Sequence, residues 1–246
     1  MIQIIIMAAG KGTRMGSELP KVLVPLKGRP MLDYLLDSIS KTDPELKPII
    51  VVSPENKNLI AEALNNYNVQ YVIQEQQLGT GHAVASTKNY IDSRVTDIFV
   101  LNGDHPFYQP KTIKDFSQQH KGVVSMITVV LSDFEGWRSV FSHWGRIIRD
   151  DNNNVQGIKE FKDSTIEEQA ILEVNPNCFC FNKDWFFSNI DKVHDDNKAH
   201  EFYLTDMVKI AFGTGHKVEA LNIDPKEAIG INSPEELKIA EGLVEV

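Results

Sequence analysis

The alternation of short apolar runs with helical patterns in the first hundred residues constrains the fold most. Runs rich in β-branched residues lie at 2–9, 48–52, 69–73 and 98–101. Segments with apolar residues at helical spacing lie at 30–40, 59–64 and 81–90. The strand-like runs are continuously apolar, as in strands that are buried on both faces of a parallel sheet. We therefore predict an α/β, Rossmann-like fold whose mixed, mainly parallel sheet carries helices on both faces.

This rhythm changes after about residue 122. Four strand-like runs follow without helical patterns between them, at 123–131, 145–149, 155–161 and 172–181. A helix, a strand and a closing helix are then expected at 201–212, 218–223 and 234–243. We predict mixed or antiparallel pairing here, in a small antiparallel lobe. Because no linker or repeat interrupts the chain, we predict a single domain over 1–246 with two halves, about 1–121 and about 122–246.

Composition excludes several function classes. The chain has 34 Asp and Glu against 25 Lys and Arg, a formal charge of -9, and no basic stripe, so we expect no nucleic-acid partner. Cys178 and Cys180 are two apart, would share one face of a strand, and lack metal-ligand spacing; we expect core thiols in a cytoplasmic protein. The first apolar run lacks a positive flank and is too short to cross a bilayer, so we expect no membrane association.

A glycine-containing loop follows the first strand at residues 8–15. Small residues let backbone N–H groups approach phosphate oxygens, Arg14 offers a planar donor fork, and Lys21 adds a positive charge. The loop has neither P-loop spacing nor the third glycine of a dinucleotide fingerprint. From these residues alone, a phosphate-binding loop and a plain turn with solvated cations are both open.

The loop followed by Leu19-Pro20-Lys21 resembles the opening signature of the sugar-nucleotidyltransferase superfamily. More narrowly, it is similar to the uridylyltransferase half of the bifunctional UDP-N-acetylglucosamine pyrophosphorylase/glucosamine-1-phosphate acetyltransferases. The resemblance extends from Met7 to Asn232 and implies a Mg²⁺-dependent transfer from an NTP to a phosphorylated acceptor, with release of pyrophosphate. It makes 1–121 the nucleotide-binding half and 122–246 the acceptor-binding half.

The resemblance also assigns site residues in the first half. It implies catalytic roles for Arg14, Lys21 and Asp104, and nucleotide contacts for Ala8, Ala9, Gly10, Gly12, Thr13, Gln74, Gly79, Thr80 and Gly103. A Gln amide beside a glycine turn suits a uracil edge, so UTP is the favoured nucleotide. A helix-entry loop capped by Thr80 is the alternative for that segment, and His82 is expected to be a structural helix residue.

Metal and acceptor contacts complete this set. Asp104 ends the fourth strand after a glycine; by itself it is equally a turn aspartate, but the resemblance makes Asp104 and Asn232 the Mg²⁺ ligands. It also implies acceptor contacts, with N-acetylglucosamine 1-phosphate favoured, at Asn102, Gly145, Glu160 and Asn175. The run Asp150 to Asn154 lacks the pattern of a calcium loop, so we expect a solvated turn.

Three departures from the family fall on the acceptor side. Asn102 stands where the family often has an aromatic residue, Pro176-Asn177 replaces its Thr-Gly, and 134–144 is longer than expected. Two alternatives therefore stay open: a cytidylyltransferase or other nucleotidyltransferase on a non-sugar phosphate, and a non-catalytic nucleotide-binding module. The family's β-helix acetyltransferase repeats are not found in these residues, which fits a stand-alone enzyme or part of a longer one. Oligomeric state is not predicted.

Overall fold

The computed structural model describes residues 1–10 and 12–243. The strands are β1 (Ile2–Met7), β2 (Pro25–Leu26), β3 (Arg29–Pro30), β4 (Ile49–Val52), β5 (Gln70–Ile73), β6 (Asp97–Asn102), β7 (Val124–Val130), β8 (Gly145–Arg149), β9 (Val155–Lys159), β10 (Glu173–Asn175), β11 (Phe179–Asn182) and β12 (Val218–Asn222). The α-helices are α1 (Met31–Ser40), α2 (Lys57–Ala63), α3 (Thr80–Ala85), α4 (Pro110–Gln119), α5 (Ile166–Gln169), α6 (Lys183–Asn189), α7 (Asp206–Gly213), α8 (Pro225–Ala228) and α9 (Pro234–Leu243). Short 3₁₀ turns include η1 (Thr13–Met15), η2 (Lys21–Leu23) and η4 (Gly136–Phe141).

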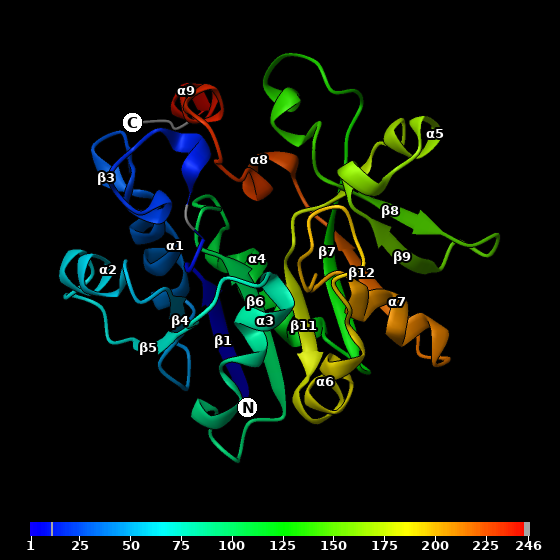
Figure 1. Cartoon of the computed structure of the whole chain (residues 1–246), viewed down its shortest axis with the longest axis horizontal. Helices are drawn as coiled ribbons and strands as arrows, with labels where there is room; N and C mark the ends of the chain where they lie inside the picture. Colours follow the sequence, from blue (N-terminus) through cyan, green and yellow to red (C-terminus); the bar gives the residue numbers. More distant parts are fainter. Residues whose placement is uncertain (11, 244–246) are drawn as a thin grey trace.

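One large sheet runs through the molecule in the order β5-β4-β1-β6-β11-β7-β10-β8-β9, with β12 paired to β7 (Figure 1). The first four strands are parallel, and β1 lies between β4 and β6, so that Ile5 is opposite Ile49 on one side and Val100 on the other. The predicted mainly parallel sheet of the first half is confirmed. Its carboxyl-end edge gathers the loops that follow β1, β5 and β6.

Both faces of this sheet are covered, because consecutive residues of β1 point to opposite sides. Ile4 and Ile6 lie in one buried cluster, whose members also come from α1 and α4. Ile5 and Met7 lie in the cluster on the other face, with members from α3, α6 and α7. The continuous apolar run of β1 therefore has a direct cause: every side chain from Gln3 to Met7 is buried.

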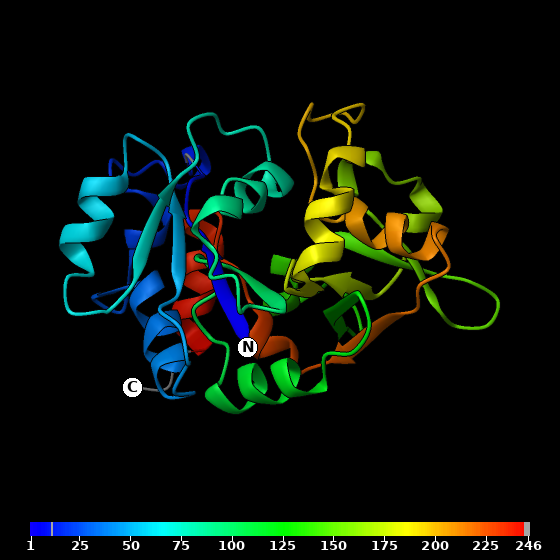
Figure 2. The same ribbon diagram turned by 90° about the horizontal axis from the view of Figure 1, so that it is seen from below.

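The second half of the sheet is largely antiparallel, as predicted. β11 pairs antiparallel with both β6 and β7, and β8 pairs antiparallel with β9 and β10; β12 is an exception, since it runs parallel to β7. Figure 2 shows the two groups of strands as adjoining parts of the molecule. The closing helix α9 returns to the first half, where Ala240 is buried in a cluster with Val24, Leu26 and Met31.

Four expectations about elements need correction. Helices α4, α5, α6 and α8 were not predicted, and α5 lies between two strand-like runs that were expected to have no helix between them. The expected strand over 172–181 is broken into β10 and β11, because Pro176 lacks a backbone N–H and Asn177 adopts a left-handed φ of 56°. The helix expected at 201–212 begins only at Asp206, because the segment before it is hydrogen-bonded to the loop ahead of α3. The helix expected at 81–90 is α3 followed by a 3₁₀ turn at Lys88–Tyr90.

Two further expectations agree with the structure. Cys178 and Cys180 are both free and fully buried, and burial raises the pKa of each thiol. Asp150 to Asn154 form a turn in which the Asp150 carboxylate accepts backbone N–H bonds from Asn152 and Asn154. In the described residues, no helix combines the length and apolar character needed to cross a bilayer.

Candidate active site

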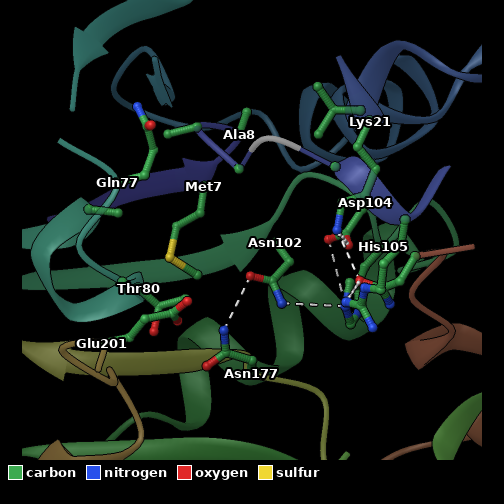
Figure 3. A pocket seen from close by; sticks show the side chains of 18 of the residues that line it. Met7, Ala8, Lys21, Gln77, Thr80, Asn102, Asp104, His105, Asn177 and Glu201 are labelled. Atoms are coloured by element: carbon green, nitrogen blue, oxygen red, sulfur yellow. Dashed lines mark hydrogen bonds and ion pairs between the residues drawn. The ribbon is translucent and has the colours of Figure 1, made fainter. Parts of the chain in front are cut away.

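A cavity of about 810 Å³ lies at the carboxyl ends of the parallel strands and reaches the antiparallel half. Open α/β sheets bind ligands at this edge. The residues predicted from the sequence that line it are Ala8, Ala9, Gly10, Gly12, Thr13, Arg14, Lys21, Gln74, Gly79, Thr80, Asn102, Asp104, Gly145, Glu160, Asn175 and Asn232. Residues from both halves of the chain thus face one continuous space, in which Figure 3 shows Lys21 and Asp104 side by side.

Gly103 is the predicted nucleotide contact that does not line this cavity. Its N–H donates to the Met7 carbonyl at 2.9 Å. A Cβ at this position would lie 3.0 Å from a methyl of Val22 and 3.1 Å from the Met7 carbonyl oxygen. Gly103 therefore lets the end of β6 pack against β1 and η2, and this packing places the neighbouring Asp104.

The loop after β1 places Lys21 by close packing. Gly12 has a left-handed φ of 61°, and a Cβ there would lie only 2.6 Å from the Cβ of Lys21. Only glycine fits both the backbone conformation and the approach of η2. Arg14, on η1 just beyond Gly12, is exposed toward the cavity. Lys11 lies outside the described residues.

Lys21 joins the two predicted metal-binding residues. Its ammonium forms an ion pair with the Asp104 carboxylate and donates to the Asn232 Oδ1 at 3.0 Å. Arg14 also donates to that Asn232 oxygen, at 3.4 Å. Burial raises the pKa of Asp104, but the positive charge and hydrogen bond of Lys21 outweigh it and hold the pKa below its ordinary value. Asp104 is therefore anionic although it is 7% exposed.

Asn232 reaches this cluster from a distant part of the chain. It precedes α9, whose first turn is closed by Ser233: the Ser233 hydroxyl accepts the Glu236 N–H at 3.2 Å. In return, the Glu236 carboxylate accepts the N–H of Asn232. This reciprocal cap fixes the residue before the helix. Packing of α9 on the first half then holds the Asn232 amide beside Lys21.

The oxygens of Asp104 and Asn232 fit a hard divalent cation. Mg²⁺ is commonly held by one or two carboxylates and completed by waters and substrate phosphate oxygens. No group of three or more His, Cys, Asp or Glu side chains in the described residues could form an all-protein cage. Two side-chain oxygens alone would leave most positions around such a metal open to waters and phosphate oxygens.

The loop between β5 and α3 builds the end of the cavity where the sequence predicts contacts to the nucleobase, called the base end below. The buried Gln74 amide donates to the Gly79 carbonyl at 3.1 Å. Gly79 has a φ of 117°, and a Cβ there would lie 2.7 Å from backbone atoms of Phe202. The Thr80 hydroxyl accepts the Leu204 N–H at 2.9 Å. Gly79 and Thr80 thus line the cavity and also hold the segment before α7.

Glu160 lies at the end of the cavity where the sequence predicts acceptor contacts, called the acceptor end below. Gly145 lets β8 and β9 approach closely here: a Cβ at Gly145 would lie 2.8 Å from Ile158, while its 3.5 Å distance to the Glu160 carboxylate would be an ordinary contact. Burial raises the pKa of Glu160, and the nearby carboxylates, led by Asp206, raise it further, while a hydrogen bond from Thr205 at 3.0 Å opposes them. A half-buried carboxylate that faces the cavity is suited to accept hydrogen bonds from ligand hydroxyl or amide groups.

The three departures from the resembled family gather on one wall. Asn177 donates to the Asn102 Oδ1 at 3.2 Å, and the Asn102 amide lies 3.4 Å from His105 (Figure 3). The His105 ring in turn lies 5.3 Å from that of Trp144, at the end of the long segment 134–144. The Asn175 Oδ1 accepts the Asn177 N–H at 2.9 Å and fixes the turn. The wall is an amide chain backed by aromatic rings.

Arg146 organises the segment that carries Trp144. Its guanidinium is 1% exposed and donates to the carbonyls of Ser142, Trp144 and Gln169. It also lies 4.6 Å from the ring centre of Phe134. Burial lowers the pKa of this group. One side chain therefore ties the ends of the long segment to α5.

Several residues in the cavity were not predicted from the sequence to be site residues. They are Gln77, His105, His143, Trp144, Pro176, Asn177, Glu201, Tyr203 and Glu236, with apolar contributions from Met7, Val22 and Ala83. The unusual segments 134–144 and 176–177 carried a signal, as departures from a pattern. The segment 200–206, which contains Glu201 and Tyr203, also resembles a segment that the family uses near the acceptor site and for packing. For His143 or Glu236, nothing in the local sequence distinguishes a cavity residue from a surface one.

A comparison with protein families identifies the chain over residues 4–204, which match the MobA-like NTP transferase domain. The chain belongs to this family. It is thus a nucleotidyltransferase of the sugar-nucleotidyltransferase group, as its motifs predicted.

Curated relatives also belong to this group of proteins by sequence, and a solved structure shows the same fold. The bifunctional protein GlmU of Caldicellulosiruptor saccharolyticus is 37% identical over 96% of this chain and 50% of its own length. GlmU of Desulfotalea psychrophila is 36% identical over 98% of this chain and 69% of its own. The chain spans about half the length of most curated relatives that it matches. The inositol-1-phosphate CTP transferase of T. maritima shares the fold, with a TM-score of 0.74 at 18% identity over 97% of this chain and 94% of that one.

Proposed function

We propose that the protein is a Mg²⁺-dependent uridylyltransferase, which joins UMP from UTP to N-acetylglucosamine 1-phosphate and releases pyrophosphate. The observation that carries the proposal is the meeting of Lys21, Asp104 and Asn232 in the cavity that also holds the predicted base and acceptor contacts. Positive charge and metal-binding oxygens at that point suit a reacting phosphate. The choice of UTP rests on the resemblance at Gln74, Gly79 and Thr80.

The reaction is an in-line displacement at the α-phosphorus. A phosphate oxygen of the acceptor forms the new P–O bond, the bond between the α-phosphorus and the bridging oxygen breaks, and pyrophosphate leaves with that electron pair. Because a phosphate monoester is already ionised near neutral pH, no general base is needed. The protein must hold the two phosphates together and neutralise their charge.

The chain's own cations supply that neutralisation. Lys21 is held by the packing of Gly12, and Arg14 offers a planar fork at the mouth of the loop. When a ligand arrives, its phosphates would take over the donors that Lys21 and Arg14 now direct at Asn232. Asp104 and Asn232 would hold Mg²⁺, which when bound stabilises charge on the phosphate oxygens.

A second candidate substrate class has its own support. The wall built by Asn102, Asn177 and Trp144 departs from the resembled family on the acceptor side, and the fold is shared with an inositol-1-phosphate CTP transferase. A polyol or other non-sugar phosphate is therefore the alternative acceptor, with CTP as the alternative nucleotide.

The test is pyrophosphate release with Mg²⁺, in which ATP, CTP, GTP and UTP are each combined with sugar 1-phosphates and small alcohol phosphates. We expect release with UTP and N-acetylglucosamine 1-phosphate. Release only with another pair would overturn the substrate assignment and keep the chemistry. Tight NTP binding without release from any pair would favour a non-catalytic nucleotide-binding protein.

A further inference from the structure

Both donors of the Gln74 amide have partners within the protein. Its Nε2 lies 3.1 Å from the Gly79 carbonyl oxygen and 3.0 Å from the Nδ1 of His82. A backbone carbonyl can only accept, so the amide nitrogen must face it. The nitrogen has two N–H groups, and the second is directed at His82. Within the described residues, no hydrogen bond uses the Gln74 Oε1.

The partner atom on His82 is defined by the same chemistry. Since the Gln74 nitrogen donates, the Nδ1 of His82 must be the acceptor, and the ring is neutral with its proton on Nε2. His82 comes from the first turns of α3, whereas Gly79 precedes that helix. The Gly79 carbonyl, just before α3, and the His82 ring, on α3, therefore hold the Gln74 amide in a single orientation. His82 does not line the cavity, although Gln74 does.

We propose that His82 is a positioning residue for nucleobase selection: it turns the Gln74 amide so that its oxygen, an acceptor, faces the base. The inference rests on the proposed function, because it assigns the base end of the same cavity. An amide oxygen pairs with a base that carries a ring N–H, as uracil does. In cytosine the corresponding ring nitrogen carries a lone pair, which repels the amide oxygen. This orientation of Gln74 therefore favours UTP over CTP.

Without the His82 acceptor, only the Gly79 carbonyl would still hold the Gln74 amide in its orientation. A leucine at position 82 would leave the second Gln74 N–H unpaired, and the amide could then rotate and present its nitrogen to the base. A neutral hydrogen bond of this kind changes an equilibrium by about fivefold. An asparagine at the same position places its Oδ1 near the site of the histidine Nδ1 and restores the acceptor.

The experiment measures the dissociation constants of UTP and CTP by calorimetry, without acceptor, for wild type, His82→Leu and His82→Asn. We expect wild type to prefer UTP, His82→Leu to lose about fivefold of that preference, and His82→Asn to keep it within about twofold. An unchanged ratio in His82→Leu, an equal loss in His82→Asn, or a wild-type preference for CTP would each overturn the inference.

Two additional measurements separate this inference from other failures. Nitrogen NMR of the wild-type His82 ring needs no variant; we expect the proton on Nε2, and a proton on Nδ1 would refute the proposed lock even if His82→Leu failed to fold. Pyrophosphate release by the wild-type protein tests the proposed function separately. Release with UTP together with an unchanged ratio in His82→Leu would leave the function standing and remove only the role of His82.

Discussion

Replacement of Gly12 by alanine should disable the site through Lys21, and Gly16 offers a matched control. The two glycines flank η1 and have nearly the same left-handed φ, 61° and 60°. A Cβ at Gly16 would meet nothing within 4 Å, whereas one at Gly12 would lie 2.6 Å from the Cβ of Lys21. The pair therefore separates backbone strain from the specific contact with Lys21.

The expected magnitude follows from these distances. Either alanine costs about 1–2 kcal/mol for the left-handed conformation. At Gly12 the contact with Lys21 must also lengthen from 2.6 Å to at least 3.4 Å before it becomes ordinary. The obstructing atoms are the Cβ and backbone of Lys21, so the base of this side chain must move. Misplacement by about 1 Å in an active site can cost about 10²-fold in rate.

The assay is steady-state pyrophosphate release together with thermal unfolding for Gly12→Ala and Gly16→Ala. We expect both variants to lose stability, Gly12→Ala more than Gly16→Ala because of the added contact with Lys21, but a fall in kcat of about 10²-fold only in Gly12→Ala. Equal kcat values in the two variants would refute the idea that Gly12 acts by placing Lys21.

Two further predictions concern the acceptor end. Arg146→Met should lower the free energy of unfolding by roughly 2–4 kcal/mol, because three carbonyls lose a charged donor, and it should raise the acceptor KM but not the NTP KM. The control is Arg149→Met, also on β8, which breaks a part-exposed ion pair with Glu173 on β10 and should cost under about 1 kcal/mol. Equal effects on both KM values in Arg146→Met would contradict the assignment. Glu160 has a raised pKa in the folded protein, so its contribution to stability is present below its ordinary value of 4.5 and is lost as pH rises through the raised value. Glu160→Gln should therefore become more stable relative to wild type as pH rises from 4.5, and a pH-independent difference in denaturant unfolding would contradict this.

Local pattern was sufficient for the parallel half of the fold. The continuous apolar runs of β1 and β6 reflect burial on both faces, and few arrangements besides a strand within a covered sheet require such a run. Long-range contacts determined what the sequence pattern missed. The residues before Asp206 look helical, but Phe202 and Leu204 hydrogen-bond to the loop around Gly79 and Thr80, and no local pattern contains that pairing.

The site residues also divide into those that local pattern indicates and those that depend on long-range contacts. Local pattern made Lys21 and Asp104 candidates, because Lys21 follows the glycine-containing loop and Asp104 follows the end of β6, but only the resemblance favoured a site over a plain turn. Asn232 could be predicted only by resemblance, since its place depends on the return of α9 to the first half. Neither the network around Arg146 nor the amide chain through Asn177 could be predicted, because each joins segments that are distant in sequence.

Lys21 and Asp104 form the proposed reactive centre of this nucleotidyltransferase. The most direct test is pyrophosphate release from UTP and N-acetylglucosamine 1-phosphate by Lys21→Met and Asp104→Asn, with Lys111→Met as the control, since Lys111 belongs to an exposed ion pair with Asp115 on α4. Thermal melts would verify that each variant is folded. We predict a fall of at least about 10²-fold in the first two variants and unchanged release in the control. Near-normal turnover in a folded Lys21→Met or Asp104→Asn would contradict the account.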